Sequence, residues 1–166
     1  MATDVKEFLQ NINFSGIQSN SNQSYSGVFV RTAQSIVTNT WTYLQWSNVL
    51  YDTDGCFDLA NPTRLTIPSG YSFAKFFFYG PINESVTYTF TGRAIYRNRS
   101  TIVVDGTNIV FSAQHDSSGS EDETYIQHWP AIPVVAGDYF EAFFCQNSGA
   151  TRGWTRDAYF GMELIR

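Results

Sequence analysis

The stretch of sequence that decides the fold is Pro133-Val134-Val135-Ala136-Gly137-Asp138-Tyr139-Phe140-Glu141-Ala142-Phe143-Phe144, followed after a polar loop by Ala158-Tyr159-Phe160-Gly161-Met162-Glu163-Leu164-Ile165. A turn at Ala136-Gly137-Asp138 leads into one alternating strand, and a second alternating strand ends the chain. A strand in that position usually lies in the middle of a sheet. The two strands therefore indicate a closed β-sandwich rather than an enzyme fold.

The rest of the chain after residue 25 has the same β-pattern, with turn residues roughly every 8–12 positions. The sequence predicts an all-β, jelly-roll β-sandwich of about 8–10 antiparallel strands. Tyr71–Tyr79 is almost continuously apolar, so both of its faces should be covered, one of them by a neighbouring subunit. Asp105-Gly106 is a strong hairpin signal. The further expected strands are Val28–Val30, Trp41–Trp46, Arg64–Ile67, Val86–Arg97, Thr101–Val104, Asn108–Gln114 and Thr124–Trp129, with Asp138–Gln146 and Ala158–Ile165 as the last two.

The N-terminal residues follow a different pattern. Four apolar residues fall at helical spacing, which predicts a short amphipathic helix: Val5, Phe8, Leu9 and Ile12. Residues 15–26 are rich in Ser, Asn, Gln and Gly and read as a flexible linker. We therefore divide the chain into an N-terminal arm and linker, helical or extended, at 1–25 and a jelly-roll domain at 26–166. A helix this short needs a partner, so it packs on its own domain or anchors the protein to another protein.

Composition excludes several classes of protein. The 166 residues suffice for one domain, and only 15% are charged, against about 25% in an average soluble domain. A net charge of −5 argues against nucleic-acid binding, which needs clustered Lys and Arg. The local cluster of Arg93, Arg97 and Arg99 suggests a solvated edge or an intersubunit pair. No apolar run is long enough for membrane insertion, and no signal peptide is expected after Met1.

The two cysteines, Cys56 and Cys145, do not make a disulfide scaffold, and their spacing fits no zinc pattern. We expect Cys56 in a loop and Cys145 in an apolar strand. Both are interpreted as reduced thiols of a protein made in a cytosol.

Five short motifs occur in a recognisable order. Trp41–Trp46, Tyr51–Gly55 and Arg64–Tyr71 resemble the first half of the complement globular-head and tumour-necrosis-factor jelly-roll superfamily. Ala136–Glu141 and Phe160–Leu164 resemble its last two strands. Arg64-Leu65-Thr66 and Gln146-Asn147-Ser148-Gly149 are closer still to the version found in tailed-phage virion proteins. The resemblance covers roughly residues 28–165.

The resemblance implies that residues 26–166 are a jelly-roll trimerisation domain, a ten-stranded jelly roll that assembles as a homotrimer. In phages, such a protein serves as a head decoration, head fibre or tail-tip component. The absence of a signal peptide and of a collagen-like stalk favours a virion protein assembled in the bacterial host cytoplasm. Its expected place is the capsid surface, with the arm bound to the major capsid protein. Candidate trimer contacts are Tyr71, Phe77, Tyr79, Tyr139, Phe143 and Tyr159.

Candidate sites for chemistry are weak. Asp52 and Asp54 superficially resemble a calcium loop, but no bidentate Glu follows at the required spacing, and an Asp-Gly turn with side-chain capping is the alternative. Glu121 and Asp122 belong to an acidic loop that either holds a cation on a trimer axis or is simply solvated. His115 and His128 lack the nucleophile and acid of a hydrolytic triad. No catalytic residue, metal or cofactor is therefore expected.

The tryptophans raise the possibility of a glycan site. Trp154, in the loop before the last strand, is the best stacking candidate, ahead of Trp41, Trp46 and Trp129; the alternative is that most of them are core or trimer contacts. Three functions remain: a structural virion protein, a tail-tip protein that binds a host receptor or glycan, and an intracellular β-sandwich enzyme. The first agrees best with the motifs, and the third has no catalytic constellation to support it.

Overall fold

The computed structural model describes residues 26–81, 90–98, 109–115, 124–153 and 158–166. These residues form thirteen β-strands and no helix, so the all-β prediction is confirmed for the part of the chain described. The expected N-terminal helix and the Asp105-Gly106 hairpin lie outside this part. No described segment is a helix long and apolar enough to cross a membrane.

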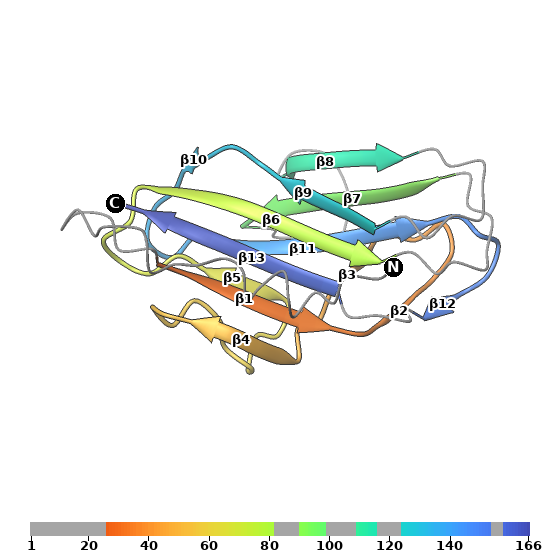
Figure 1. The fold of residues 1–166 in the computed structure, drawn as a ribbon, viewed down its shortest axis with the longest axis horizontal. Helices are drawn as coiled ribbons and strands as arrows, with labels where there is room; N and C mark the ends of the chain where they lie inside the picture. The colour runs from red at the N-terminus through yellow and green to blue at the C-terminus, as the bar shows by residue number, and fades with distance from the viewer. Residues whose placement is uncertain (1–25, 82–89, 99–108, 116–123, 154–157) are drawn as a thin grey trace, which may run out of the picture.

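One layer of the sandwich, the β13 sheet, has the order β10-β6-β13-β1-β4, with β9 also paired to β6 (Figure 1). The strand β13 lies between β6 and β1 and is antiparallel to both, as expected of the terminal strand. The strands of this sheet are β1 (Ser26–Thr32), β4 (Asn48–Asp52), β6 (Phe73–Pro81), β9 (Thr124–His128), β10 (Ile132–Pro133) and β13 (Ala158–Ile165).

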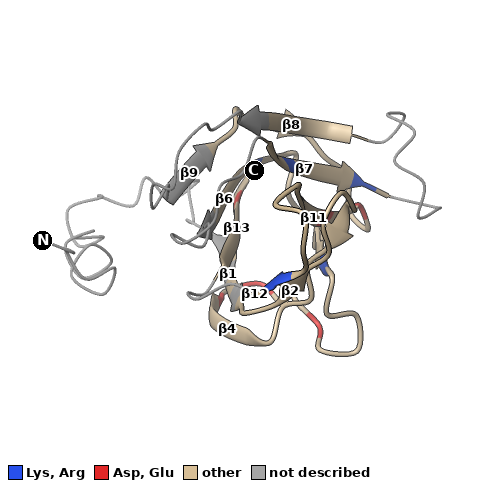
Figure 2. Ribbon diagram, turned by 90° about the vertical axis from the view of Figure 1, so that its right-hand side faces the viewer, with Lys and Arg blue, Asp and Glu red and all other residues tan. Residues whose placement is uncertain are grey.

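The second layer, the β11 sheet, has the order β3-β11-β7-β8, with β5 also paired to β11. Figure 2 looks along the sandwich and shows the two layers facing each other, with β2 and β12 at one end. Its strands are β3 (Thr42–Tyr43), β5 (Arg64–Thr66), β7 (Thr91–Arg97), β8 (Ile109–His115) and β11 (Tyr139–Gln146), and the separate pair is β2 (Ser35–Ile36) and β12 (Arg152–Gly153).

The core lies between the two inner faces and is rich in aromatic rings. The rings of Phe76 on β6 and Phe140 on β11 are 4.4 Å apart between centroids and join the two layers. Trp46 stacks on Phe160 at 5.6 Å. Because successive residues of a strand point to opposite faces, every second residue of β13 from Ala158 to Leu164 is buried in this core.

Two local expectations are corrected. Trp41–Trp46 is a strand only at Thr42–Tyr43, since the Leu44 and Trp46 amides donate to Ala142 and Pro62, on different segments. Edge strand β4 was not foreseen, because Val49, Leu50 and Tyr51 show no alternation and all three are exposed.

The prediction that the arginine cluster lies on a solvated edge is wrong for Arg93. Arg93 is not a solvated edge residue: it is only 1% exposed, and its guanidinium carbon lies 5.4 Å from the centroid of the Phe144 ring. The register Phe144↔Arg93 places the two side chains opposite each other on neighbouring strands.

The turn before β11 is held by the buried carboxylate of Asp138. It accepts hydrogen bonds from the Val135 amide, the Asn98 side chain and the Arg97 guanidinium. Burial acts to raise the pKa of Asp138, but these donors outweigh it and hold that pKa below its ordinary value. Gly137 has a φ of 89°, a conformation that favours glycine, and it completes the turn.

Candidate functional site

The outer face of the β13 sheet carries a row of aromatic side chains on its two central strands. Phe73, Phe77 and Tyr79 alternate with core residues along β6, and Tyr159 and Ile165 do so along β13. All five are partly or largely accessible. We call these five residues, four of them aromatic, the outer aromatic face. Large rings left at a protein surface are a feature of interfaces.

Strand register brings the members of this face together. Phe77 lies opposite Gly161, and Tyr79 lies opposite Tyr159. The Phe77 ring covers Gly161 so closely that a Cβ added there would lie 1.6 Å from a ring carbon. The Tyr79 and Tyr159 rings meet edge to face, with centroids 5.4 Å apart. Gly161 therefore leaves the space that the Phe77 ring occupies.

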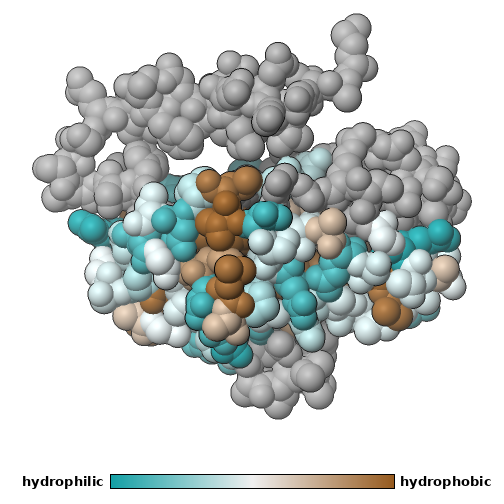
Figure 3. Space-filling model, turned by 90° about the horizontal axis from the view of Figure 1, so that it is seen from below, coloured by the Kyte–Doolittle hydropathy of each residue, from teal (hydrophilic) through white to brown (hydrophobic). Residues whose placement is uncertain are grey.

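Charged and apolar groups continue this surface toward the edge of the sheet. Lys75 and Glu163, which are register partners, form an ion pair at 3.5 Å. Partial burial raises the pKa of Tyr51 on β4, and the Glu163 carboxylate raises it further. Val49 and Leu50 on β4 are 44% and 43% exposed. Figure 3 views the molecule from the side on which β4 lies and shows a narrow stripe of hydrophobic side chains.

The structure places only some of the six candidate trimer contacts on the outer aromatic face. Phe77, Tyr79 and Tyr159 belong to the outer aromatic face. Tyr71 is buried and donates to Asp54 at 2.7 Å. Phe143, on the β11 sheet, is 1% exposed and packs against Ala94 and Tyr96, so the protomer itself already covers it.

Tyr139, the sixth candidate, lies under the Arg64 guanidinium at 4.1 Å. Sequence reasoning missed Phe73, Gly161 and the Lys75–Glu163 pair, although the alternation in β6 and β13 already placed them on the side of Phe77 and Tyr159.

The Asp52–Gly55 segment is a capped turn. The Asp52 carboxylate accepts hydrogen bonds from the amides of Cys56 and Phe57, both at 2.9 Å, and from Asp54 at 3.4 Å. Asp54 accepts from the hydroxyls of Thr53 and Tyr71. These donors occupy the oxygens that a cation would need. Throughout the described ranges, no three His, Cys, Asp or Glu side chains gather in a group able to hold a metal ion.

Both cysteines are free and buried. Burial, and then the nearby Asp52 and Asp54 carboxylates, raise the pKa of the Cys56 thiol to about 12. Burial also raises the pKa of Cys145. Neither thiol is therefore set up as a nucleophile.

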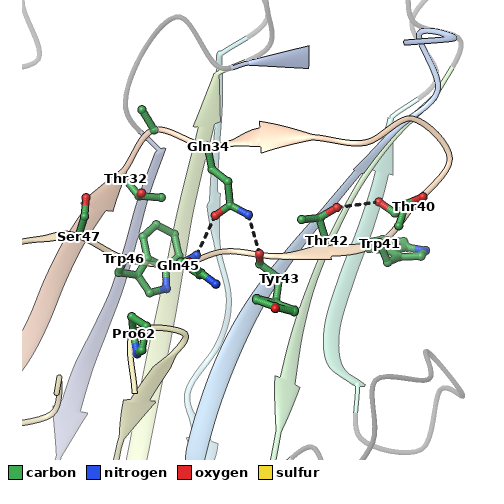
Figure 4. Close-up of a pocket in the computed structure, with 11 residues that line it drawn as sticks. Thr32, Gln34, Thr40, Trp41, Thr42, Tyr43, Gln45, Trp46, Ser47 and Pro62 are labelled. Carbon is green, nitrogen blue, oxygen red and sulfur yellow. Dashed lines mark hydrogen bonds between the residues drawn. The ribbon is translucent and has the colours of Figure 1, made fainter. Parts of the chain in front are cut away.

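A groove of about 640 Å³ lies at one end of the sandwich, where the chain passes from β1 through β2 and β3 toward β4 (Figure 4). Gln34 braces it: the side-chain amide donates to the Tyr43 carbonyl at 3.0 Å and accepts from the Gln45 amide at 2.9 Å. The lining residues are Thr32, Ala33, Gln34, Thr40, Trp41, Thr42, Tyr43, Gln45, Trp46, Ser47 and Pro62.

Most of the other sequence candidates lie outside the groove. Trp46 belongs to the core as well as to the groove, and Trp129 stacks on Phe111 at 5.3 Å. His128 is exposed, its ring 6.2 Å from that of Phe77. The glycan candidate, the acidic-loop residues and the four anchor residues fall outside the described ranges: Trp154, Glu121, Asp122, Val5, Phe8, Leu9 and Ile12.

No protein-family model and no curated protein matches the sequence. Solved structures nevertheless share the fold. The globular domain of zebrafish complement 1qA protein has a TM-score of 0.62 and 12% identity, covering 86% of this chain and 98% of that one. Murine APRIL at pH 8.0 has a TM-score of 0.61 and 10% identity, covering 86% and 100%. The expected complement-head and tumour-necrosis-factor-like jelly roll is therefore confirmed as a fold.

Proposed function

We propose that this chain is a structural virion protein of a tailed bacteriophage, a homotrimeric capsid decoration or short head fibre without enzymatic activity. Three copies associate through the outer aromatic face, and the arm at residues 1–25 attaches the trimer to the capsid. Assembly takes place in the cytoplasm of the bacterial host.

The observation that carries the proposal is the Phe77 ring lying on Gly161 beside the Tyr79–Tyr159 pair. These rings lie on the outer side of β6 and β13, away from the core. In an isolated sandwich they would leave an aromatic surface in contact with water. Aromatic side chains dominate the energetics of protein interfaces, since they bury a large area with few rotatable bonds. In the proposed homotrimer, a second copy of the chain covers the outer aromatic face.

The proposed virion location rests on the resemblance of Arg64-Leu65-Thr66 and Gln146-Asn147-Ser148-Gly149 to tailed-phage virion proteins. Arg64-Leu65-Thr66 forms β5, with Leu65 in the core. The buried side chain of Gln146 donates to the carbonyls of Ile36 and Ala150 and accepts from the Ser148 amide. The two motifs lie at opposite ends of β11, since Arg64–Thr66 pairs with Tyr139–Glu141 and Gln146 is the last residue of that strand.

Light scattering of the purified full-length protein tests the assembly. The wild type should have the mass of a trimer, and Phe77→Arg should be a monomer with an unchanged far-ultraviolet circular dichroism spectrum. Val135→Arg, at an exposed position in the turn before β11, is the matched control and should stay trimeric. A wild-type monomer at micromolar concentration, or a trimeric Phe77→Arg, would contradict the proposal.

Gold-labelled antibody on intact particles tests the location, because label on heads supports a decoration or head fibre and label on tail tips contradicts it.

Deletion of residues 1–20 tests the anchor. The shortened protein should remain a trimer and lose co-sedimentation with capsids; retained co-sedimentation would overturn the role of the arm.

A second candidate function, host attachment at a tail tip through a receptor or glycan, is favoured by one observation. The groove next to β3 combines aromatic rings with uncharged hydrogen-bonding groups, as small-ligand sites commonly do. Trp41→Ala should then reduce adsorption of phage particles to host cells without changing the trimer.

A further inference from the structure

We infer that the groove next to β3 binds a neutral carbohydrate chain, with Trp41 as the stacking platform and with the Gln45 side chain and the Trp46 indole as hydrogen-bonding groups. This inference rests on the second candidate function, host attachment, and assigns to it a site and a ligand class.

The lining favours a neutral ligand over a charged one. None of the eleven lining residues is Asp, Glu, Lys, Arg or His. A sulfate, phosphate or uronate group would lose water there without gaining an opposite charge, which is strongly unfavourable. The hydroxyls of Thr40, Thr42 and Ser47 and the exposed Gln45 side-chain amide suit a ligand covered with hydroxyls. A threonine hydroxyl that already donates to a backbone carbonyl can still accept from such a ligand.

Trp41 is held as a rigid platform. One edge of its ring packs on Gly92 of β7, 2.6 Å from the position that a Cβ would occupy. It also packs against the cluster of Ala94, Tyr96 and Phe143 on the outer face of the β11 sheet. The ring remains partly accessible in the groove. An aromatic ring fixed on one side and open on the other offers a flat apolar surface to the C–H face of a pyranose.

Trp46 supplies a donor that the protein itself does not use. The residue is 1% exposed, and its Nε1 has no hydrogen-bond acceptor among the described residues. Figure 4 shows this nitrogen on the side of the ring that faces Pro62. A buried N–H without an acceptor costs free energy, and a sugar hydroxyl entering the groove can accept from it.

The groove is also preorganised. Gln34 binds both the Tyr43 carbonyl and the Gln45 amide, so the chain on either side of Leu44 is fixed before any ligand arrives (Figure 4). The Gln45 side chain itself points away from the core and is exposed. A preformed site loses less conformational freedom on binding.

Intrinsic tryptophan fluorescence titration of the full-length protein tests the inference. The neutral probes are maltohexaose, mannohexaose and chitohexaose, and the acidic probes are hexagalacturonate and a heparin hexasaccharide. At least one neutral probe should bind with a Kd of about 1 mM or tighter, and the acidic probes should bind at least about 10-fold more weakly. No neutral binding up to about 10 mM, or equal binding of acidic probes, would overturn the inference.

Variants locate the site. Trp41→Ala and Gln45→Ala should each weaken binding of the neutral probe about 5- to 10-fold or more. Trp129→Ala, which removes a tryptophan outside the groove, is the matched control and should keep wild-type affinity. Unchanged affinity in both groove variants, with melting temperatures showing that they are folded, would place the ligand elsewhere and refute the inference.

Light scattering of the same samples separates this inference from the proposed assembly. A trimer that binds no neutral probe refutes the groove site and leaves the structural proposal standing. A monomer that binds a neutral probe supports the groove site and refutes the trimer.

Discussion

The Phe77 ring occupies the space that a side chain on Gly161 would fill, and a Cβ on Gly161 would be 1.6 Å from the nearest ring carbon. The two residues are register partners on the central strands of the β13 sheet, β6 and β13. Only a residue without a Cβ leaves room for the Phe77 ring in this position.

Gly161→Ala should therefore displace the Phe77 ring. We expect a loss of about 1–3 kcal/mol in the free energy of unfolding, because the methyl group overpacks a backbone contact, together with weaker trimer association. Chemical denaturation and light scattering measure the two effects. Gly153→Ala is the control: its Cβ would lie 3.7 Å from the Ser35 hydroxyl, which is an ordinary contact. Equal stabilities of the two variants would contradict the expected strain.

Asp138 should make stability depend on acid pH. Its folded-state pKa is below the ordinary value, so its contribution is present above the pKa of the unfolded chain, about 3.9, and is lost as pH falls through the folded-state pKa. Asp138→Asn should cost about 1–3 kcal/mol at neutral pH, and the difference from wild type should shrink below about pH 4.

Denaturant titrations across pH measure this dependence. Glu163→Gln, which breaks the more exposed Lys75 pair, should cost less than about 1 kcal/mol and serves as the control. A difference between Asp138→Asn and wild type that stays constant with pH would show that the Asp138 charge is not responsible.

Asp52 should act on stability through its hydrogen bonds. Asp52→Ala leaves the Cys56 and Phe57 amides without their acceptor and should cost about 1–3 kcal/mol. Asp58→Ala, which removes a cap from the exposed Ala60 amide, is the control and should cost less. Melting curves with and without millimolar CaCl2 should coincide, since the Asp52 oxygens are occupied; a rise in melting temperature with calcium would restore the cation reading.

The thiols should be unreactive in the native protein. Because burial and two carboxylates raise the Cys56 pKa to about 12, the thiolate is scarce at pH 8. Ellman's reagent should react slowly with native protein and quickly with both thiols in guanidinium chloride. The folded protein holds the Cys56 proton more tightly than the unfolded chain does. The resulting stabilisation is complete at pH values below the pKa of the unfolded thiol and should be lost as pH rises from about 9 toward 12. Rapid labelling of the native protein at pH 8 would contradict this.

Much of the sandwich could be predicted because strand patterns are local. The alternation in Ala158–Ile165 assigns Phe160, Met162 and Leu164 to one face, and the structure buries all three. Two segments misled the prediction. Trp41–Trp46 alternates, but its backbone amides donate to different segments of the chain. The run from Val49 to Tyr51 is an edge strand without alternation, because a strand that is exposed on both faces needs none.

The candidate site was less predictable. Trp46 and Trp41 look equivalent in the sequence, yet Trp46 stacks on Phe160 in the core while Trp41 remains accessible on Gly92. The partner of each ring lies more than forty residues away in the chain, and no local pattern encodes such a pairing.

The sequence by itself determined the fold class, the central strand at Ala158–Ile165 and the residues that share each face, because low charge and a period of two are properties of single segments. Only the tertiary structure decided that Phe77 lies on Gly161, that Arg97 reaches Asp138 and that Gln34 braces a groove. These contacts depend on the register of strands and loops that meet only when the sandwich closes, and one residue of slip would turn each side chain to the opposite face.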